Sequence, residues 1–356
     1  MQCVLTNKTT VDQIKLLEYP SRKLDKAEIR LKIEHFGFTS NNITYAVIGD
    51  RFGYWNFFPA PKDADKFGII PVWGYGKVIE SDHTAINLGQ KYFGYFPLAT
   101  ELIVKPGQIT DRSFIDESPH RSMLPTPYNT YHSASDSIHV HREYDRMTLS
   151  PLYLTSFIIW HAVKKSDWYG AEQILLLSAS SKTSIGTAYA FRMDESAPLV
   201  VGMTSSTNIG QLKELDIYNQ LVTYQDWTGI DLKKKTLVID MSGNLQIRSR
   251  LFNELGVNFQ YCLKVGLSHW DATAGDDIPK EKGTVFFAPS FIGEWIEQKG
   301  MADFYSKSNA FFKGCSQFTS SWFEYKLING LDELVTLFPL LIKGAIPANN
   351  LNIIRL

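Results

Sequence analysis

The segment from Gln173 to Gly186, QILLLSASSKTSIG, constrains the fold of this chain more than any other. Ile174–Leu177 is a short apolar run of the kind that is buried inside a parallel sheet. Small or hydroxylated residues and one lysine follow, and the residues after Gly186 are typical of a helix packed on that sheet. A strand, a tight turn and a helix N-terminus together favour an anion, because N–H groups and the helix dipole point at it. This order predicts the diphosphate site of a dinucleotide-binding domain.

The glycine spacing of this segment departs from the usual dinucleotide motif, G-x-G-x-x-G. Ser178 and Ser180 occupy the positions of the first two glycines, and the loop is longer before Gly186. Two other interpretations stay open for the segment alone. It is either an ordinary turn with a solvated Lys182, or the end of a nucleoside-triphosphate loop, which here lacks its upstream glycines and a partner acid.

The composition excludes several classes of protein. The 356 residues are enough for two domains, and the net charge of −1 gives no basic surplus for nucleic acid or an anionic membrane. Cys3, Cys262 and Cys315 have no short-range pairing, which fits a reducing cytoplasm. We expect a cytoplasmic protein, since the N-terminus lacks an apolar signal segment and the apolar stretches are too short for a bilayer.

Residues 1–150 are predicted to form a β-rich domain with a long loop. Polar and apolar residues alternate in Gln13–Glu18 and Glu28–Glu34, which predicts half-buried strands. Residues 108–150 are irregular and polar, and a loop of this length is usually functional. His139 and His141 would share one strand face as a metal pair, but no third ligand lies at a suitable spacing.

Residues 151–300 alternate predicted strands and helices, which calls for a parallel sheet covered on both faces. The predicted strands of this domain are Ile174–Leu177, Leu199–Gly202, Gln220–Tyr224, Thr236–Asp240, Asn258–Val265 and Thr284–Ala288. Residues 301–356 are predicted to be mostly helical, and they end in a strand that returns to the first domain.

Several stretches resemble the medium-chain dehydrogenase/reductase superfamily, and in particular its zinc-free quinone oxidoreductase-like branch. EIRLKIEHFGFTSNN is similar to the strand and turn that lead to the active site, LLLSASSKTSIG to the phosphate loop, and LVIDMSGN to the D-x-x-G strand. Longer stretches, NNITYAVIGDRFGYWNFFPAP and VGLSHWDA, resemble a domain-of-unknown-function family within that superfamily. The resemblance implies an α/β fold: a doubly wound Rossmann sheet plus a GroES-like β-barrel that the C-terminal tail completes.

The chain departs from the zinc members of the superfamily. Thr39 occupies the position of their first cysteine ligand, and Pro71–Trp73 that of their G-H-E segment. Catalytic zinc needs three protein ligands, so we predict a zinc-free protein with no metal.

The predicted cofactor is NADP, bound as NADPH. Thr204, Ser205 and Ser206 end the second strand of the predicted sheet, where an NAD site carries an acid that would repel a 2′-phosphate. Tyr224 and Lys182 are candidates for contacts with the adenosine phosphate, and the resemblance implies a place for Gly243 and Gly266 beside the nicotinamide ribose. The full candidate set is Ser178, Ser180, Ser181, Lys182, Thr183, Ser184, Thr204, Ser205, Ser206, Tyr224, Gly243 and Gly266.

A zinc-free reductase must polarise its acceptor with a hydroxyl or amide hydrogen bond. The candidate donors are Asn42, Tyr45, Tyr128 and His269, with Asn41, Tyr131 and Tyr153 as further possibilities. The rings of Phe52, Tyr54, Trp55, Phe57 and Phe58 either wall a cleft for an apolar or aromatic acceptor or build a small core.

These features favour an NADPH-dependent, zinc-free reductase of an enone, quinone or other conjugated carbonyl, acting on a small apolar or aromatic substrate. Two alternatives stay open. One is a non-catalytic or regulatory dinucleotide-binding protein of the same fold, which the serine-for-glycine loop favours. The other is a carrier-dependent enoyl reductase that docks its carrier on residues 108–150. We expect a homodimer, as relatives in the superfamily often pair through the edge of the Rossmann sheet.

Overall fold

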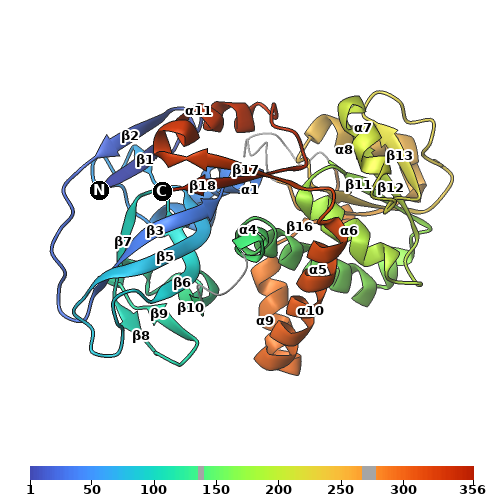
Figure 1. Ribbon diagram of the computed structural model, residues 1–356. Helices are drawn as coiled ribbons and strands as arrows, with labels where there is room; N and C mark the ends of the chain where they lie inside the picture. The colour runs from blue at the N-terminus through green and yellow to red at the C-terminus, as the bar shows by residue number, and fades with distance from the viewer. Residues whose placement is uncertain (135–139, 267–277) are drawn as a thin grey trace. The chain divides into compact units, whose positions relative to one another are not determined.

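The computed structural model describes residues 1–134, 140–266 and 278–356. The chain divides into two compact units, one of Met1–Thr148 with Glu324–Leu356 and the other of Leu149–Phe323. Both termini lie in the first unit (Figure 1). Helix α10 (Met301–Thr319) belongs to the second unit, so the chain rejoins the first unit later than the predicted residue 301.

The first unit is built on two sheets. The smaller sheet has the order β2-β1-β4, and the larger has the order β17-β18-β3-β5-β6-β10-β9-β8, with β7 paired to β3. The first strands are β1 (Gln2–Asn7), β2 (Ile14–Glu18), β3 (Ile29–Gly37), β4 (Phe67–Gly68), β5 (Pro71–Ser81), β6 (Lys91–Pro97), β7 (Glu101–Val104), β8 (Pro106–Gly107), β9 (Ser113–Asp116) and β10 (Thr130–Ala134). The helices between them are α1 (Ser40–Val47), α2 (Gly49–Phe52), α3 (Thr126–Asn129) and α4 (Val140–Thr148).

The C-terminal tail completes the larger sheet, as the sequence predicts. Strand β18 (Asn350–Arg355) pairs antiparallel with β3, placing Ile353 opposite Gly37. It also pairs in parallel with β17 (Glu324–Asn329), and helix α11 (Gly330–Ile342) connects these two strands. A parallel pair needs such a crossover connection.

The segment predicted as an irregular loop, 108–150, contains regular structure instead. The buried Arg121 organises it, donating to Asp116 at 3.0 Å, to Asn129 at 2.9 Å and to the hydroxyl of Tyr131 at 2.9 Å. The strand predicted for the histidine pair is wrong for His141, which lies in α4. His139 lies outside the described residues.

The second unit contains a six-stranded parallel sheet of order β13-β12-β11-β14-β15-β16. Its strands are β11 (Gln173–Leu177), β12 (Leu199–Thr204), β13 (Gln220–Thr223), β14 (Thr236–Asp240), β15 (Phe259–Lys264) and β16 (Gly283–Val285). Its α-helices are α5 (Ser150–Lys165), α6 (Lys182–Arg192), α7 (Ile209–Lys213), α8 (Leu245–Leu255), α9 (Ala288–Lys299) and α10. Each predicted strand is present, within a few residues at each end.

Single-turn helices complete both units: η1 (Tyr54–Asn56), η2 (Pro119–Arg121), η3 (Asp167–Gly170), η4 (Ser206–Asn208), η5 (Gly256–Asn258) and η6 (Lys280–Lys282). None of the helices in the described parts of the chain is long and apolar enough to cross a membrane.

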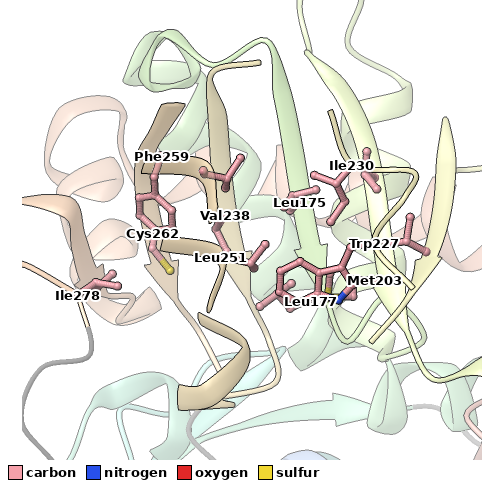
Figure 2. Packing of buried hydrophobic residues seen from close by; sticks show 13 residues of the cluster. Leu175, Leu177, Met203, Trp227, Ile230, Val238, Leu251, Phe259, Cys262 and Ile278 are labelled. Atoms are coloured by element: carbon pink, nitrogen blue, oxygen red, sulfur yellow. The ribbon is translucent and has the colours of Figure 1, made fainter. Parts of the chain in front are cut away.

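The core of the second unit explains why β11 is apolar at every position. Leu175 and Leu177 point to one face of the sheet, into a cluster with Met203, Val238 and Leu251 (Figure 2). Ile174 and Leu176 are also fully buried. A strand that is covered on both faces reads as a continuous apolar run, so this segment could be recognised from the sequence.

Candidate functional site

Parallel strands bring the candidate cofactor residues to one edge of the second unit's sheet. Ser178 follows β11, Thr204 ends β12, Tyr224 follows β13, Gly243 follows β14 and Gly266 follows β15. The chain runs from β11 to β12 on one side and later to β14 on the other, so β11 is the point where the strand order reverses. Ligands of open parallel sheets bind at the carboxyl ends of the strands at such a point.

The loop after β11 keeps the backbone conformation of a glycine loop although serines replace the glycines. Ser178 has a φ of 58°, in the left-handed region that glycine usually occupies. Ser181 begins α6 as its N-cap, and its Oγ accepts from the backbone N–H of Ser184 at 3.2 Å. The loop therefore leads directly into a capped helix N-terminus, where the dipole favours an anion.

Hydroxyl groups connect this loop to the end of β12. The Oγ of Ser180 lies 3.1 Å from Oγ1 of Thr204 and accepts from Asn208 Nδ2 at 2.9 Å. Ser180 and Thr204 are both buried, whereas Ser205 is half-buried and Ser206 is exposed. Of the three residues at the end of β12 that are predicted to face the 2′-phosphate, Ser205 and Ser206 are thus the ones that a ligand can reach.

Tyr224 and Lys182 lie against the same loop. The Tyr224 hydroxyl accepts from the backbone N–H of Ser178 at 3.0 Å, and burial raises the pKa of Tyr224. Lys182 is half-buried at the first turn of α6, with its ammonium 5.5 Å from the ring centroid of Phe323. Burial lowers the pKa of Lys182 to about 8.

A buried ion pair that the sequence interpretation missed fixes the turn after β14. Oδ2 of Asp240 lies 2.6 Å from Nη1 of Arg248, and Oδ1 accepts from the backbone N–H groups of Ser242 at 2.8 Å and Gly243 at 3.0 Å. Both charged side chains are buried. The spacing of an acid at a strand end and an arginine eight residues later was the available signal.

Gly266 lies where the ends of β14 and β15 approach each other. Its backbone N–H donates to the carbonyl of Asp240 at 2.8 Å. A Cβ at this position would lie 2.0 Å from the carbonyl oxygen of Met241, so no side chain fits. A glycine at position 266 therefore allows the two strand ends to approach this closely.

Asn42, a predicted hydrogen-bond donor to the substrate oxygen, is bonded within the first unit. Its Oδ1 accepts from the backbone N–H of Thr39 at 2.8 Å, and its Nδ2 donates to the carbonyl of Pro71 at 3.0 Å. Thr39 and Asn42 form the capping box of α1. Both polar atoms of the Asn42 side chain therefore have structural partners.

Tyr45 and Tyr128 lie in one aromatic cluster of the first unit. The ring centroids of Tyr45 and Tyr54 are 4.6 Å apart, and the hydroxyls of Tyr54 and Tyr128 lie 3.4 Å apart. Trp73 and Tyr95 complete the cluster, at 5.9 and 4.9 Å from the Tyr128 ring. Burial raises the pKa of Tyr45 and of Tyr128, so both hydroxyls keep their protons at neutral pH.

The aromatic run after α1 forms a core and does not wall a cleft. Tyr54, Trp55, Phe57 and Phe58 expose between 1% and 8% of their surface. A Cβ on Gly68 would lie 2.3 Å from the Trp55 ring, which shows how closely the backbone packs on it. Of the two interpretations left open by the sequence, the core is the correct one for these four rings.

The other candidate donors are engaged elsewhere. Tyr131 donates to the carbonyl of Tyr95 at 2.6 Å, and Tyr153 shares a hydrogen bond of 2.8 Å with Thr319 between helices α5 and α10. His269 lies outside the described residues. Within the described residues, no three His, Cys, Asp or Glu side chains lie together as metal ligands.

A cavity of about 360 Å³ lies at the opposite edge of the second unit's sheet. Leu199, at the start of β12, Arg192 and Asp216 are among its lining residues. It is therefore separate from the loop after β11.

Known structures share this architecture. CurA from Vibrio vulnificus in complex with NADPH superposes with a TM-score of 0.62 at 10% identity, covering 100% of this chain and 99% of that chain. The quinone oxidoreductase from Coxiella burnetii gives a TM-score of 0.53 at 15% identity, covering 100% and 99%. The yhdH oxidoreductase from Salmonella enterica in complex with NADP gives 0.54 at 10% identity, covering 100% of both chains.

The chain therefore shares the fold of these structures, a Rossmann sheet combined with a GroES-like domain. The chain belongs to the family described as "Protein of unknown function (DUF2855)", whose model matches residues 36–347. No curated protein matches the chain in sequence.

Proposed function

We propose that this protein is an NADP(H)-dependent oxidoreductase. The observation that carries the proposal is the small-residue loop between β11 and a capped α6, at the point where the strand order of a parallel sheet reverses. This is the usual place for the diphosphate of a dinucleotide. The similar folds of CurA and yhdH, described with NADPH and with NADP, support the same assignment.

The end of β12 supports NADPH over NADH. An NAD site places an acid here, which would repel a 2′-phosphate, whereas this chain has Thr204, Ser205 and Ser206. Thr204 is bonded to Ser180, so we assign phosphate contact to Ser205 and Ser206. Lys182 and Tyr224 would contact the diphosphate side from within the loop.

The proposed reaction is the zinc-free reduction of a conjugated carbonyl, enone or quinone. When bound, the cofactor supplies the hydride, and the electron pair of the acceptor moves onto its oxygen. A hydroxyl donor lowers the energy of that developing charge. Tyr45 and Tyr128 are the donors that we assign, because a neutral phenol hydroxyl can both accept from a neighbour and donate to the substrate oxygen, whereas both polar atoms of Asn42 are bonded to the backbone.

Three further parts of the proposal concern the protein's setting. We infer a small apolar or aromatic carbonyl substrate, a cytoplasmic location and a homodimer, with no part for nucleic acid, membrane or metal. His269 stays a proposed contact near the nicotinamide.

One observation favours the alternative of a dinucleotide-binding protein without turnover. The Tyr224 hydroxyl occupies the N–H of Ser178, and Ser180 is bonded to Thr204 and Asn208. Part of the hydrogen-bonding capacity of the loop is thus used by the protein itself. We therefore keep the alternative of a dinucleotide-binding protein of the same fold, which the serine-for-glycine loop favours.

Binding and turnover are separated by two measurements on the intact protein. NADPH fluorescence and the unfolding temperature report binding, and the loss of NADPH absorbance with a panel of quinones and enones reports turnover. Binding with turnover supports the oxidoreductase, and binding with none of the acceptors supports the alternative. No response to either NADPH or NADH would refute both.

The preference for NADPH is tested by the substitution Ser206→Asp. The new carboxylate repels the 2′-phosphate, so we expect NADPH affinity to fall by roughly tenfold while NADH affinity is unchanged. Ser122→Asp, at an exposed serine of the first unit, adds the same charge and should change neither affinity. An equal loss of NADPH and NADH affinity in Ser206→Asp would contradict the assignment.

A further inference from the structure

Ser178, the first residue of the loop after β11, has a backbone conformation that its side chain disfavours. Its φ of 58° lies in the left-handed region, which glycine adopts without strain and a residue with a Cβ does not. The usual dinucleotide motif has a glycine at this position. Contacts from outside the loop are therefore needed to hold Ser178 in this conformation.

Two tyrosine hydroxyls bond to the backbone of the loop at this point. The hydroxyl of Tyr224 accepts from the backbone N–H of Ser178 at 3.0 Å. The hydroxyl of Tyr218 donates to the backbone carbonyl of Ala179 at 2.7 Å. One hydroxyl thus fixes the peptide before Ser178 and the other the peptide after Ala179, so both ends of the turn are anchored.

Both tyrosines come from the ends of β13, which lies on the far side of β12 from β11. The backbone N–H of Asn219, next to Tyr218, donates to the carbonyl of Val200 at 2.9 Å. The backbone N–H of Tyr224 donates to the carbonyl of Thr204 at 3.1 Å. Because these bonds attach each end of β13 to β12, the two hydroxyls are held in fixed positions beside the loop.

Gly202 on β12 makes room for the Tyr218 ring. A Cβ at position 202 would lie 2.8 Å from Cδ1 of Tyr218 and 2.9 Å from Cβ of Ala179. A side chain here would therefore displace one of the two partners of the hydrogen bond. Glycine inside a strand weakens it and often marks a close approach of this kind.

The two hydroxyls are neutral. Tyr218 and Tyr224 are half-buried, and burial raises the pKa of each, so both keep their protons at neutral pH. Tyr218 needs its proton, because only a protonated hydroxyl can donate to the carbonyl of Ala179.

We propose that Tyr218 and Tyr224 are positioning residues, which hold the loop after β11 in the conformation that glycine gives the usual dinucleotide motif. This inference rests on the proposed function and identifies residues that set the affinity of the same site. Tyr218 acts on the cofactor through Ala179, to which its hydroxyl is bonded. A loop that is already formed binds more tightly, because only molecules in the binding conformation contribute to the affinity.

Tyr218→Phe tests this role, because it keeps the ring and removes the hydroxyl. We expect the calorimetric affinity of the intact protein for NADPH to fall by about fivefold, as the loss of one hydrogen bond provides. Hydrogen–deuterium exchange without cofactor should become faster in residues 178–181. Tyr261→Phe is the matched control and should change neither quantity, since Tyr261 is half-buried in the same unit and pairs with Leu237 near the amino end of the sheet.

Ser178→Gly distinguishes positioning from a general loss of stability. Glycine adopts a positive φ without strain, so Ser178→Gly combined with Tyr218→Phe should restore most of the lost affinity. Asp167→Gly is the control for this step, because Asp167 also has a positive φ, of 48°, but is exposed in the turn before β11. Combined with Tyr218→Phe, it should leave the affinity low.

The outcomes separate this inference from the proposed function. NADPH binding that Tyr218→Phe leaves unchanged would overturn only the positioning role. A loss that both glycine substitutions restore, or that neither restores, would also overturn it, because the loss would then come from the stability of the whole unit. Absence of NADPH binding by the wild type would refute the proposed function, and unchanged exchange in residues 178–181 would then refute the positioning role as well.

Discussion

At the scale of the single residue, Asp240 fixes the turn after β14 through its ion pair with Arg248. Its substitution by asparagine would remove the carboxylate that neutralises the buried Arg248, which typically costs about 3–5 kcal/mol. We expect Asp240→Asn to lower the free energy of unfolding in urea by that amount. Glu254→Gln, which removes the exposed partner of Arg250, should cost less than about 1 kcal/mol. Equal costs would show that the buried pair has no special role.

Lys182 gives the second prediction at this scale. Because burial lowers the pKa of Lys182 to about 8, the unfolded chain binds more protons than the folded chain between that pH and the usual pKa of lysine. The free energy of unfolding should therefore gain a contribution from Lys182 as pH rises from about 8 to 10, lose it as pH falls over the same range, and receive no further change from Lys182 below pH 8. Urea denaturation of Lys182→Met should lack this contribution, whereas the exposed Lys233→Met should keep it. Identical pH profiles for Lys182→Met and wild type would contradict the burial of this lysine.

The positions of individual site residues could be predicted only where the order of strand, loop and helix determines them. The loop residues and Thr204 lie at the expected edge because a buried strand followed by a helix fixes the direction of the chain. The structural role of Asn42 was not predictable in full, since its Nδ2 donates to the carbonyl of Pro71, 29 positions away.

At the scale of the element, a turn with left-handed backbone conformation precedes β11. Asp167, Trp168 and Tyr169 have φ values of 48°, 52° and 56°, and Gly170 has 66°. Left-handed backbone costs an L-residue about 1–2 kcal/mol, and the turn is held by the buried Trp168 and by the stacking of Tyr169 on Tyr261 at 4.3 Å.

Gly170→Ala therefore tests the turn by backbone strain alone. No atom lies within 4 Å of the new Cβ, so the expected loss of about 1 kcal/mol comes from the positive φ. Gly210 in α7 has equal space and no positive φ, and Gly210→Ala should instead stabilise the protein by up to about 1 kcal/mol. Urea unfolding of both variants decides the point, and a loss of the same size in both would contradict it.

Elements of the second unit followed from the sequence because their patterns are strong. Strand β14 has the predicted bounds, Thr236–Asp240, and helix α8 after it begins with Asn244 as its N-cap. The regular structure of residues 108–134 was not predicted. It depends on contacts of Arg121 with Asp116, Asn129 and Tyr131, which only the folded chain brings together.

At the scale of the whole molecule, the two-unit organisation followed from the change between strand-rich and alternating segments. The boundary at Phe323 could not be predicted from the sequence, since α10 has an apolar face that would suit either unit.

If NADPH binds only the folded second unit, it should stabilise that unit by about 2.7 kcal/mol at a concentration of 100 times its Kd.

Thr183→Glu tests the diphosphate site most directly. Thr183 lies in the first turn of α6, where a carboxylate suits the helix dipole but repels a diphosphate. Ala302→Glu, in the first turn of α10, adds the same charge away from the strand ends. The measurement is the calorimetric affinity for NADPH. We predict binding by the wild type and Ala302→Glu, and at least a tenfold loss in Thr183→Glu with its unfolding temperature preserved. Equal affinity in all three proteins, or no binding by the wild type, would contradict the assignment of the loop after β11 as the dinucleotide site.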